Sequence, residues 1–412
     1  MATKTWTGRA ASVAQVTRVT WSATGSHTYN VTINGKTVSY VSTTSSLATI
    51  IDGLIAAWNA SSEPEHQELI AAQRIESTVL VGLQLTARAG GVPHTITASA
   101  SSGTATVTEI TAASGPNFWN LAANWSGGAL PSAADDLVLE DSSVAVLYGL
   151  TDTTNYASLT IKASYTGAIG LPPTNAAGYP EYRTRFLTLG NGSGTLVVNI
   201  GDGPGVGAGR ILIDLNDGTG TVTVFASPAN TLEGFPIQLF GLDSSSVVNV
   251  YGGSILLDDP SSAAVSALNI IERPGARVRP SVSVSSRVTV ATITCMGGEL
   301  ILESNATTLT ARDGATVTTR LASATPTVKV GSRARINWES SGGISTKLTA
   351  EPGGTCDFGR VASTKTIAAA DIHAGGSILD PLDKITWTTG VVLVGARLAD
   401  VTLDLGFGVT IS

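Results

Sequence analysis

Residues 288–331, VTVATITCMGGELILESNATTLTARDGATVTTRLASATPTVKVG, decide the fold of this chain. Short apolar strands alternate in this stretch with turns centred on glycine, and the same pattern continues toward the C-terminal end. The turn glycines are Gly298, Gly314, Gly331, Gly354, Gly376 and Gly395. They are separated by 16, 17, 23, 22 and 19 residues, and a period of about twenty residues matches one coil of a β-solenoid. A β-sandwich of short strands gives a similar spacing and is the alternative.

Helical periodicity is absent from about residue 137 onward, so we assign the solenoid body to residues 137–412. The composition agrees with this assignment. Charged residues make up 13% of the chain, against about 25% in ordinary soluble domains, and 45 of the 412 residues are glycine. Few charges, many glycines and abundant β-branched residues are typical of strands joined by tight turns. The sequence therefore predicts a mainly β protein.

An N-terminal α+β domain is predicted over residues 1–112. Apolar residues from Leu47 to Trp58 recur at helical spacing, and Ser45 or Ser46 precedes them as an N-cap. The other elements are strands, so we expect one sheet covered on one face by this helix.

A hairpin is the clearest local signal in this domain. Asn34-Gly35 lies between two alternating segments, and a type I′ turn needs two residues that tolerate positive φ. The strands expected in the domain are Ala14–Trp21, Thr28–Ile33, Thr37–Val41, Ile70–Ile75, Val79–Ala87 and His94–Ala98.

A Trp-containing linker over residues 113–136 follows the boundary at Gly115-Pro116, and we expect it to form the first rung of the solenoid. Trp119 and Trp125 lie six residues apart in a chain that has only seven tryptophans. The favoured interpretation is an apolar plug over the open end of a long core. The alternatives are an aromatic platform for sugars and a contact with another subunit.

The cysteines and the net charge exclude several classes of function. Cys295 and Cys356 are the only cysteines, too few for a disulfide framework and too far apart for a zinc site. We therefore expect no metal and no cofactor. A net charge of −7 without a Lys/Arg stripe argues against a nucleic-acid partner.

We find no targeting signal in the sequence. No run of about 18 apolar residues occurs, so no membrane span is expected. The N-terminal residues lack an apolar signal region, and the expectation is a protein made in the cytoplasm.

Two loops resemble ligand sites only superficially. Asp202–Gly209 is rich in glycine, but a strand at residues 211–213 follows it where a phosphate loop would lead into a helix. Asp214, Asn216 and Asp217 offer oxygen ligands, yet Gly218 stands where an EF-hand loop has a ligand. We predict turns in both places and leave a weak calcium site near Asp214 as an open question.

Polysaccharide cleavage is the enzymatic alternative, because glycoside hydrolysis needs two carboxylates. The candidate pairs are Asp258 with Asp259, Glu299 with Glu303, and Asp380 with Asp383. Adjacent strand residues point to opposite faces, and residues four apart along a strand are separated by about 13 Å, too far for either standard geometry. We therefore predict a protein without catalytic residues.

The densest polar and aromatic cluster of the chain lies within residues 179–185. Its members are Tyr179, Glu181, Tyr182, Arg183 and Arg185. A loop pinned by an ion pair between Glu181 and one of the arginines is one interpretation. The other is a subunit contact, because Tyr and Arg are enriched at interface hot spots, and we take these residues together with Trp119 and Trp125 as interface candidates.

The first half of the chain contains six stretches that carry a resemblance to a known family: Tyr29–Gly35, Leu47–Trp58, Phe118–Asp136, Tyr148–Leu150, Ile169–Pro172 and Tyr179–Arg183. The first two resemble a small domain of tailed-bacteriophage structural proteins, and the others resemble virion proteins of a decoration or fibre-like kind. The resemblance implies particle assembly without catalysis, localisation in the virion, and docking to capsid or tail proteins.

By analogy with phage β-solenoids, the resemblance also implies a homotrimer. The scarce charge on the body would then reflect lateral packing between subunits. The chain ends on Val409–Ser412 without a polar cap, so we expect another subunit to cover that end. Host glycan is a further partner to consider.

Overall fold

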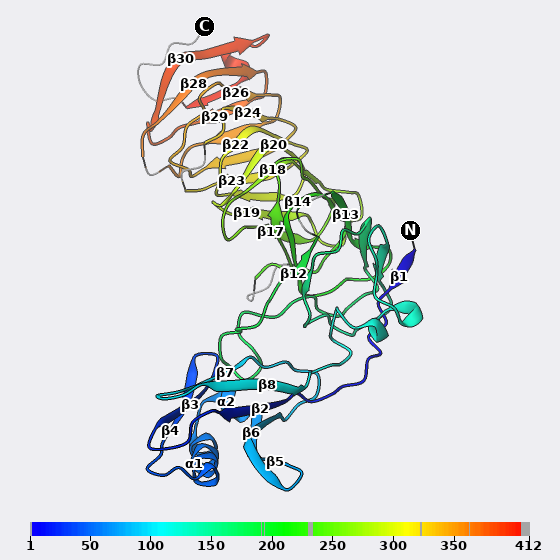
Figure 1. Cartoon of the computed structure of the whole chain (residues 1–412). Coiled ribbons are helices and arrows are strands. Elements are labelled where there is room, and N and C mark those ends of the chain that lie inside the picture. Colours follow the sequence, from blue (N-terminus) through cyan, green and yellow to red (C-terminus); the bar gives the residue numbers. More distant parts are fainter. Residues whose placement is uncertain are drawn as a thin grey trace.

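The computed structural model describes residues 2–404, apart from Asn191, Ser193, 230–233, 322–323 and Ala362. The Val409–Ser412 end, on which we base the expectation of a covering subunit, lies outside the described residues. The protein is 48% strand and 7% helix, with a β-solenoid of about 12 turns and a small N-terminal α+β region. Figure 1 shows the solenoid extending from the N-terminal domain toward the C-terminal end. The predicted fold class is therefore confirmed.

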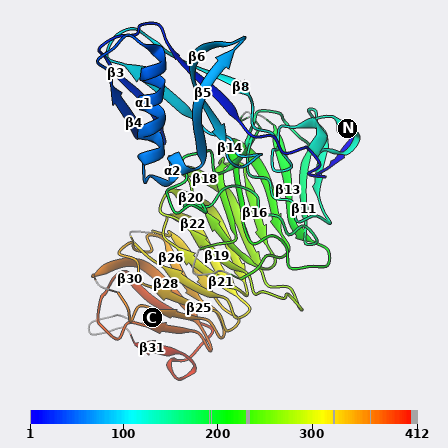
Figure 2. The same cartoon turned by 90° about the horizontal axis from the view of Figure 1, so that it is seen from below.

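Two parallel sheets form the walls of the solenoid. The first contains β1 (Thr3–Thr5), β9 (Asp136–Leu139), β11 (Ser158–Lys162), β13 (Thr195–Asp202), the second half of β14 (Ile211–Val224), β16 (Val247–Val250), β18 (Ala263–Ile271), β20 (Val288–Met296), β22 (Ala306–Arg312), β24 (Thr327–Val330), β26 (Lys347–Ala350), β28 (Lys365–His373) and β30 (Ile385–Val394). Figure 2 shows most of these strands side by side.

The second sheet begins with short strands and then follows the first sheet coil by coil. It contains β10 (Thr151–Asp152), β12 (Leu187–Leu189), the first half of β14, β15 (Ile237–Leu242), β17 (Ser254–Leu257), β19 (Ser281–Val284), β21 (Glu299–Leu302), β23 (Thr316–Thr319), β25 (Arg335–Trp338), β27 (Thr355–Asp357), β29 (Ser377–Leu379) and β31 (Thr402–Asp404). Each strand pairs with the equivalent strand of the next coil, and all these pairings are parallel. Because every pairing is parallel and joins successive coils, the fold is the solenoid and not the alternative β-sandwich.

Alternation along each strand separates the core from the surface, because successive side chains point to opposite faces. One inner ladder of the first sheet runs through Leu137, Leu159, Val198, Val222, Val248, Leu268, Ile293, Leu309, Val328, Leu348, Ala370 and Val391. All of these residues are buried in one continuous hydrophobic core. The burial of an apolar ladder in every coil supplies the stacking energy that holds neighbouring coils together.

The turn glycines mark one corner of each coil in the C-terminal half of the solenoid, between a strand of the first sheet and the next strand of the second. Gly298 and Gly314 have φ of 74° and 79°, where L side chains are strained. A Cβ on Gly298 would also lie 2.7 Å from the carbonyl oxygen of Pro280. At Gly354 and Gly376 the positive φ belongs instead to the preceding glycine, Gly353 or Gly375. The glycine period in the sequence thus counts the coils from β20 onward.

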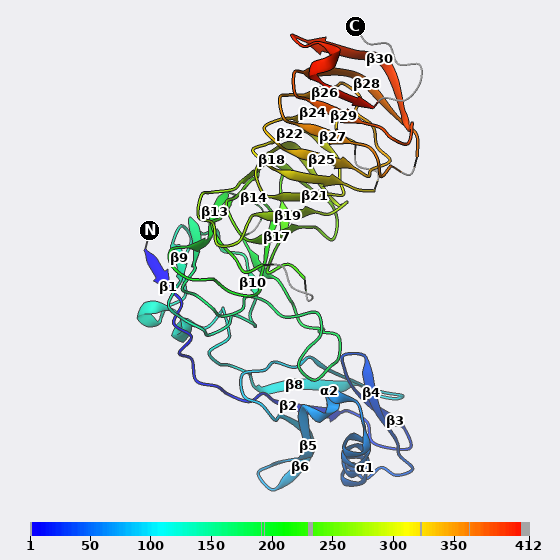
Figure 3. The same ribbon diagram turned by 180° about the vertical axis from the view of Figure 1, so that it is seen from behind.

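The first strand of the chain belongs to the solenoid rather than to the N-terminal domain. Thr3–Thr5 pair in parallel with Asp136–Val138, and Figure 3 shows β1 beside β9. The predicted first domain at 1–112 therefore includes a strand that the structure places in another unit. The chain leaves the solenoid after β1, forms the N-terminal domain and then returns.

The N-terminal domain has two antiparallel sheets, where we expect one. The four-stranded sheet has the order β5 (Leu69–Glu76), β6 (Val79–Ala87), β2 (Val16–Trp21) and β8 (Ala105–Thr111). The three-stranded sheet has the order β4 (Lys36–Val41), β3 (Thr28–Ile33) and β7 (Ile96–Ala100). Helix α1 (Leu47–Ala60) packs against β4, β5 and β6, and a short helix α2 (Pro64–Gln67) follows. The helix thus contacts both sheets.

The local signals of this domain are confirmed. The side chain of Ser46 accepts a hydrogen bond from the Thr49 amide and caps α1. Asn34 and Gly35 have φ of 50° and 73° at the turn between β3 and β4, as a type I′ turn requires. Within the part of the chain that the structure describes, no helix is long and apolar enough to cross a membrane.

Candidate functional site

An irregular hairpin leaves the solenoid between β11 and β12 and reaches the N-terminal domain. The Leu171 amide donates to the Arg185 carbonyl at 3.0 Å and closes its base. Near the tip, the Asn175 amide donates to the Tyr179 carbonyl, also at 3.0 Å. We call residues 171–185 the arm. The arm carries all five residues of the polar and aromatic cluster, so the solenoid holds that cluster on a braced loop.

The arm meets the N-terminal domain at Glu68, the C-cap of α2. The Tyr179 hydroxyl donates to Glu68 Oε2 at 2.7 Å, and Arg183 Nη2 donates to the same oxygen at 3.3 Å. Asn175 Nδ2 lies 3.4 Å from the other carboxylate oxygen. One carboxylate of the domain therefore accepts from three donors of the arm, and we call this contact the clamp.

Arg183 is the centre of the clamp. Its Nη1 donates to both carboxylate oxygens of Glu181, at 3.0 and 3.1 Å, and its Nε donates to the Pro93 carbonyl at 2.7 Å. The side chains of Arg183 and Glu181 are 9% and 1% exposed. Charge-assisted bonds of this kind are stronger than neutral ones, and the pairing confirms the interpretation in which Glu181 pins the loop.

His94 lies beside Arg183 in the clamp. Its Nδ1 is 3.4 Å from Arg183 Nη2 and 3.6 Å from Glu68 Oε2. Burial, together with the Arg183 charge, lowers the pKa of His94 to about 4. The ring is therefore neutral at neutral pH, and its approach to Glu68 is a packing contact rather than an ion pair.

Tyr182 joins the arm to the hydrophobic core of the N-terminal domain, against which its ring packs. The Arg183 guanidinium lies 4.6 Å from the centre of that ring, a cation–π distance. The structure thus brings Tyr179, Glu181, Tyr182 and Arg183 together at a contact between two domains of one chain. Arg185 lies apart from them, at a cleft on the solenoid side of the arm.

Trp119 and Trp125 lie in a second cluster, at the first rung of the solenoid, and each is 1% exposed. Trp6 completes it. The Trp6 ring centre is 5.4 Å from that of Trp125 and 6.2 Å from that of Trp119. All three indole N–H groups donate hydrogen bonds within the fold: Trp6 to the Val144 carbonyl, Trp125 to the Trp119 carbonyl, and Trp119 to the Asp152 carboxylate. Such buried rings form an apolar plug and present no platform to a sugar.

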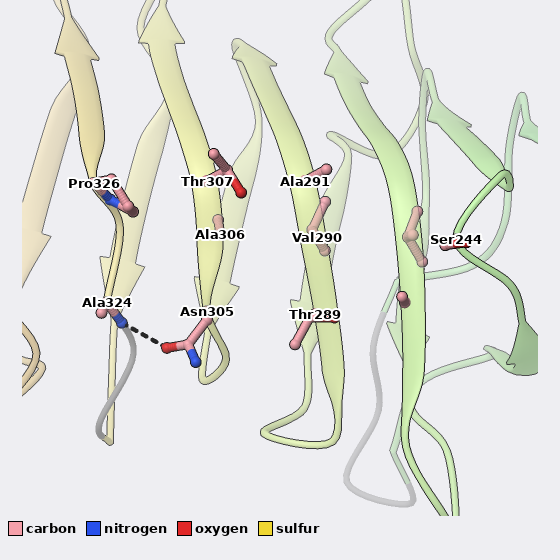
Figure 4. A pocket seen from close by; sticks show the side chains of 11 residues that line it. Ser244, Thr289, Val290, Ala291, Asn305, Ala306, Thr307, Ala324 and Pro326 are labelled. Atoms are coloured by element: carbon pink, nitrogen blue, oxygen red, sulfur yellow. Dashed lines mark hydrogen bonds between the residues drawn. The ribbon is translucent and has the colours of Figure 1, made fainter. Parts of the chain in front are cut away.

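A shallow lateral groove runs along the starts of β18, β20 and β22, with a volume of about 440 Å³. Figure 4 shows Thr289, Val290 and Ala291 on one strand beside Asn305 and its neighbours on the next. Asn305 Oδ1 accepts a hydrogen bond from the Ala324 amide at 2.9 Å and fixes one wall. No titratable side chain lines the groove among the described residues, so the groove offers a contact surface and no acid–base chemistry.

The predicted turn near Asp214 is a bulge within β14, where Asn216 and Asp217 have φ of 52° and 56°. Asp214 Oδ1 accepts the Asn216 amide, and burial raises the pKa of the Asp214 carboxyl. Among the described residues no group of three or more His, Cys, Asp or Glu side chains is placed to hold a metal ion. The bulge is thus a local turn within the strand.

Comparisons with known proteins give no match. No protein-family model, no curated protein and no solved structure matches this chain. Its functional assignment therefore depends on the geometry of the clamp, the grooves and the solenoid surface.

Sequence reasoning missed Glu68, Asn175 and His94 of the clamp and Trp6 of the tryptophan cluster. Glu68 gives no local signal, because its partners lie more than 100 residues away in the chain. Trp6 did carry a signal. Trp6-Thr7-Gly8 repeats the Trp-Ser-Gly pattern of Trp125–Gly127, and the two tryptophans form an isolated antiparallel bridge.

Proposed function

We propose that this chain is a non-catalytic structural protein of a tailed-phage particle. The clamp is the observation that carries the proposal. A buried Arg183 joins the N-terminal domain to the solenoid through Glu68, so the domain is held on the solenoid rather than tethered by a free linker. A domain held in a fixed position on an elongated solenoid suits a protein that docks to other particle proteins or sets the distance between them.

Three of the six candidate carboxylates support a role without catalysis. Asp258 pairs with Arg287, Asp259 accepts the amides of Gly241 and Ser261, and Asp380 accepts the amides at the start of β30. These groups stabilise turns of the solenoid. Their hydrogen-bonding capacity is directed at backbone and neighbouring side chains, whereas a glycosidase needs a proton donor and a second carboxylate facing the sugar.

Self-association into a homotrimer belongs to the same proposal, with the outer face of the first sheet as the lateral surface. The outward ladder of that sheet is uncharged over six successive coils, at Asn199, Thr223, Asn249, Asn269, Thr294 and Thr310. Depletion of charge at the centre is the compositional mark of subunit interfaces. The next coil introduces Lys329, which limits the neutral surface.

The proposal is tested on the purified full-length chain. Light scattering coupled to size exclusion gives its mass, and negative-stain imaging gives its shape. An elongated trimer supports the proposal, and antibody labelling of intact particles then locates the protein in the virion. Release of reducing ends from capsule or lipopolysaccharide by the purified chain contradicts the absence of catalysis.

A further inference from the structure

A second cleft lies on the solenoid side of the arm, beside Arg185. Its volume is about 810 Å³, within the range of roughly 300–1,000 Å³ that is usual for small-ligand sites. The arm forms one wall, through Pro172 and Pro173, and the first strands of the second sheet form the other, through Leu212 and Gln238. The cleft is therefore built from two parts of the chain, the arm and the solenoid.

Two arginines line this cleft in a chain that is poor in charge. Arg185 Nε donates to the Leu171 carbonyl at 3.2 Å, and Arg210 Nε donates to the Gly170 carbonyl at 3.1 Å. Neighbouring carbonyls thus hold both guanidinium groups by their Nε atoms. The described residues that line the cleft include these two arginines and no carboxylate.

The charge of Arg185 lacks a dedicated counter-ion among the described residues. The acidic group that acts on it is Glu181, but both oxygens of that carboxylate accept hydrogen bonds from Arg183. Burial accordingly lowers the pKa of Arg185. Arg185 is half-buried and lines an open cleft, and a guanidinium suits a bidentate acceptor such as a carboxylate.

The remaining walls combine apolar and neutral polar groups. Pro172, Pro173 and Phe235 supply flat apolar surface, while Thr174 and Gln238 supply a hydroxyl and an amide. Apolar faces suit the C–H face of a pyranose ring, and the amide and hydroxyl suit its hydroxyl groups. A recessed cleft of this size accommodates a short oligosaccharide but excludes a nucleic-acid duplex.

We propose that this cleft binds a short acidic oligosaccharide, whose carboxylate pairs with Arg185 and whose ring lies against Phe235 and the two prolines. The chain would then contact an acidic glycan in addition to building a particle. This inference goes beyond the proposed structural role and fails separately from it. A chain that assembles as proposed but binds no acidic sugar overturns the inference alone.

The test uses the full-length chain and matched sugars: trigalacturonate against maltotriose, and 3′-sialyllactose against lactose. Saturation-transfer NMR detects contact, and isothermal titration gives the affinity. We expect at least one acidic sugar to bind and its neutral counterpart to bind far more weakly. Arg185→Met should weaken binding roughly tenfold or more, because it removes a charge-assisted pair.

Arg360→Met is the control, since it removes the same charge from an exposed arginine in a distant coil, and it should leave the affinity unchanged. Gln238→Glu places a carboxylate in the cleft without touching the Arg185 bonds, and it should also abolish binding. This second variant keeps the test decisive if Arg185→Met fails to fold. Equal binding of acidic and neutral sugars, binding of none, wild-type affinity in both folded variants, or full displacement by inorganic phosphate would each overturn the proposal.

Discussion

Glu68 and Arg183 lie 115 residues apart in the chain, yet Arg183 Nη2 donates to Glu68 Oε2 at 3.3 Å. Arg183 is also held by Glu181 and by the Pro93 carbonyl. The same guanidinium thus bonds to the arm and to the N-terminal domain. Removing it breaks the contact between the two units and leaves buried Glu181 without a counter-ion.

Arg183→Met is therefore expected to lower the free energy of unfolding by about 3–5 kcal/mol, the usual cost of breaking a buried pair. Glu68→Gln should cost less, about 1–2 kcal/mol, because Arg183 keeps Glu181. Chemical denaturation measures both values. Small-angle scattering should show a wider range of domain positions in both variants, and an unchanged profile together with unchanged stability would contradict the clamp.

The exposed pair between Lys36 and Glu63, at 3.0 Å, supplies the control for the clamp. Surface ion pairs of this kind contribute little to stability. Lys36→Met should leave both the unfolding midpoint and the scattering profile as they are in the unmodified chain.

The stability of the protein should fall in acid through His94. Its pKa in the folded state is about 4, below the ordinary value of 6.5, so the unfolded chain takes up the proton first. The contribution of neutral His94 to the free energy of unfolding is fully present above pH 6.5 and is lost as the pH falls from 6.5 to about 4. It amounts to at most about 3 kcal/mol.

Unfolding free energies measured across that interval check the His94 prediction. The free energy of unfolding of His94→Gln should decline less steeply with falling pH than that of the unmodified chain, since the other titratable groups are the same in both. Superimposable pH profiles would mean that His94 has the same pKa in the folded and unfolded states.

The solenoid could be predicted from the sequence because its signals are local. Each C-terminal coil repeats a turn glycine and a pair of alternating strands, so Gly298 and Gly314 reveal the period without reference to the rest of the chain. The helix cap at Ser46 and the turn at Asn34 could be predicted for the same reason, because their signals are also local. Such features are fixed by nearest neighbours and by backbone conformation.

The clamp could not be predicted, because it depends on two segments that meet only in the folded chain. Nothing around Glu68 distinguishes it from an ordinary surface carboxylate. Strand β8 (Ala105–Thr111) was missed for a different reason. It is an edge strand with an irregular burial pattern, so it lacks the alternation on which strand prediction relies.

Trp6→Ala should lower the free energy of unfolding by about 3–5 kcal/mol, because it leaves a large cavity in a packed cluster. Trp6 is 2% exposed and contacts the rings of both Trp119 and Trp125. Trp6→Phe retains an aromatic ring and should cost clearly less. Denaturation followed by circular dichroism measures the difference, and an alanine variant as stable as the unmodified chain would show that β1 does not anchor the first rung.

The thiols test the register of the solenoid strands. Cys295 is buried on β20, its Sγ donates to the Gly297 carbonyl at 3.2 Å, and burial raises the pKa of its thiol to about 12. Burial also raises the pKa of Cys356. Both thiols should therefore be inert toward a disulfide reagent in the folded protein and should react once the protein is unfolded.

Met296 supplies the matched position, because it is adjacent to Cys295 on β20, points to the opposite face and is 36% exposed. A thiol introduced by Met296→Cys should react at least about a hundredfold faster than Cys295, whose reaction requires local opening of the coil. Absorbance of the released reagent gives both rates. If Cys295 reacts as fast as the new thiol, β20 is shifted by one residue, and the inner ladder through Ile293 faces solvent instead of the core.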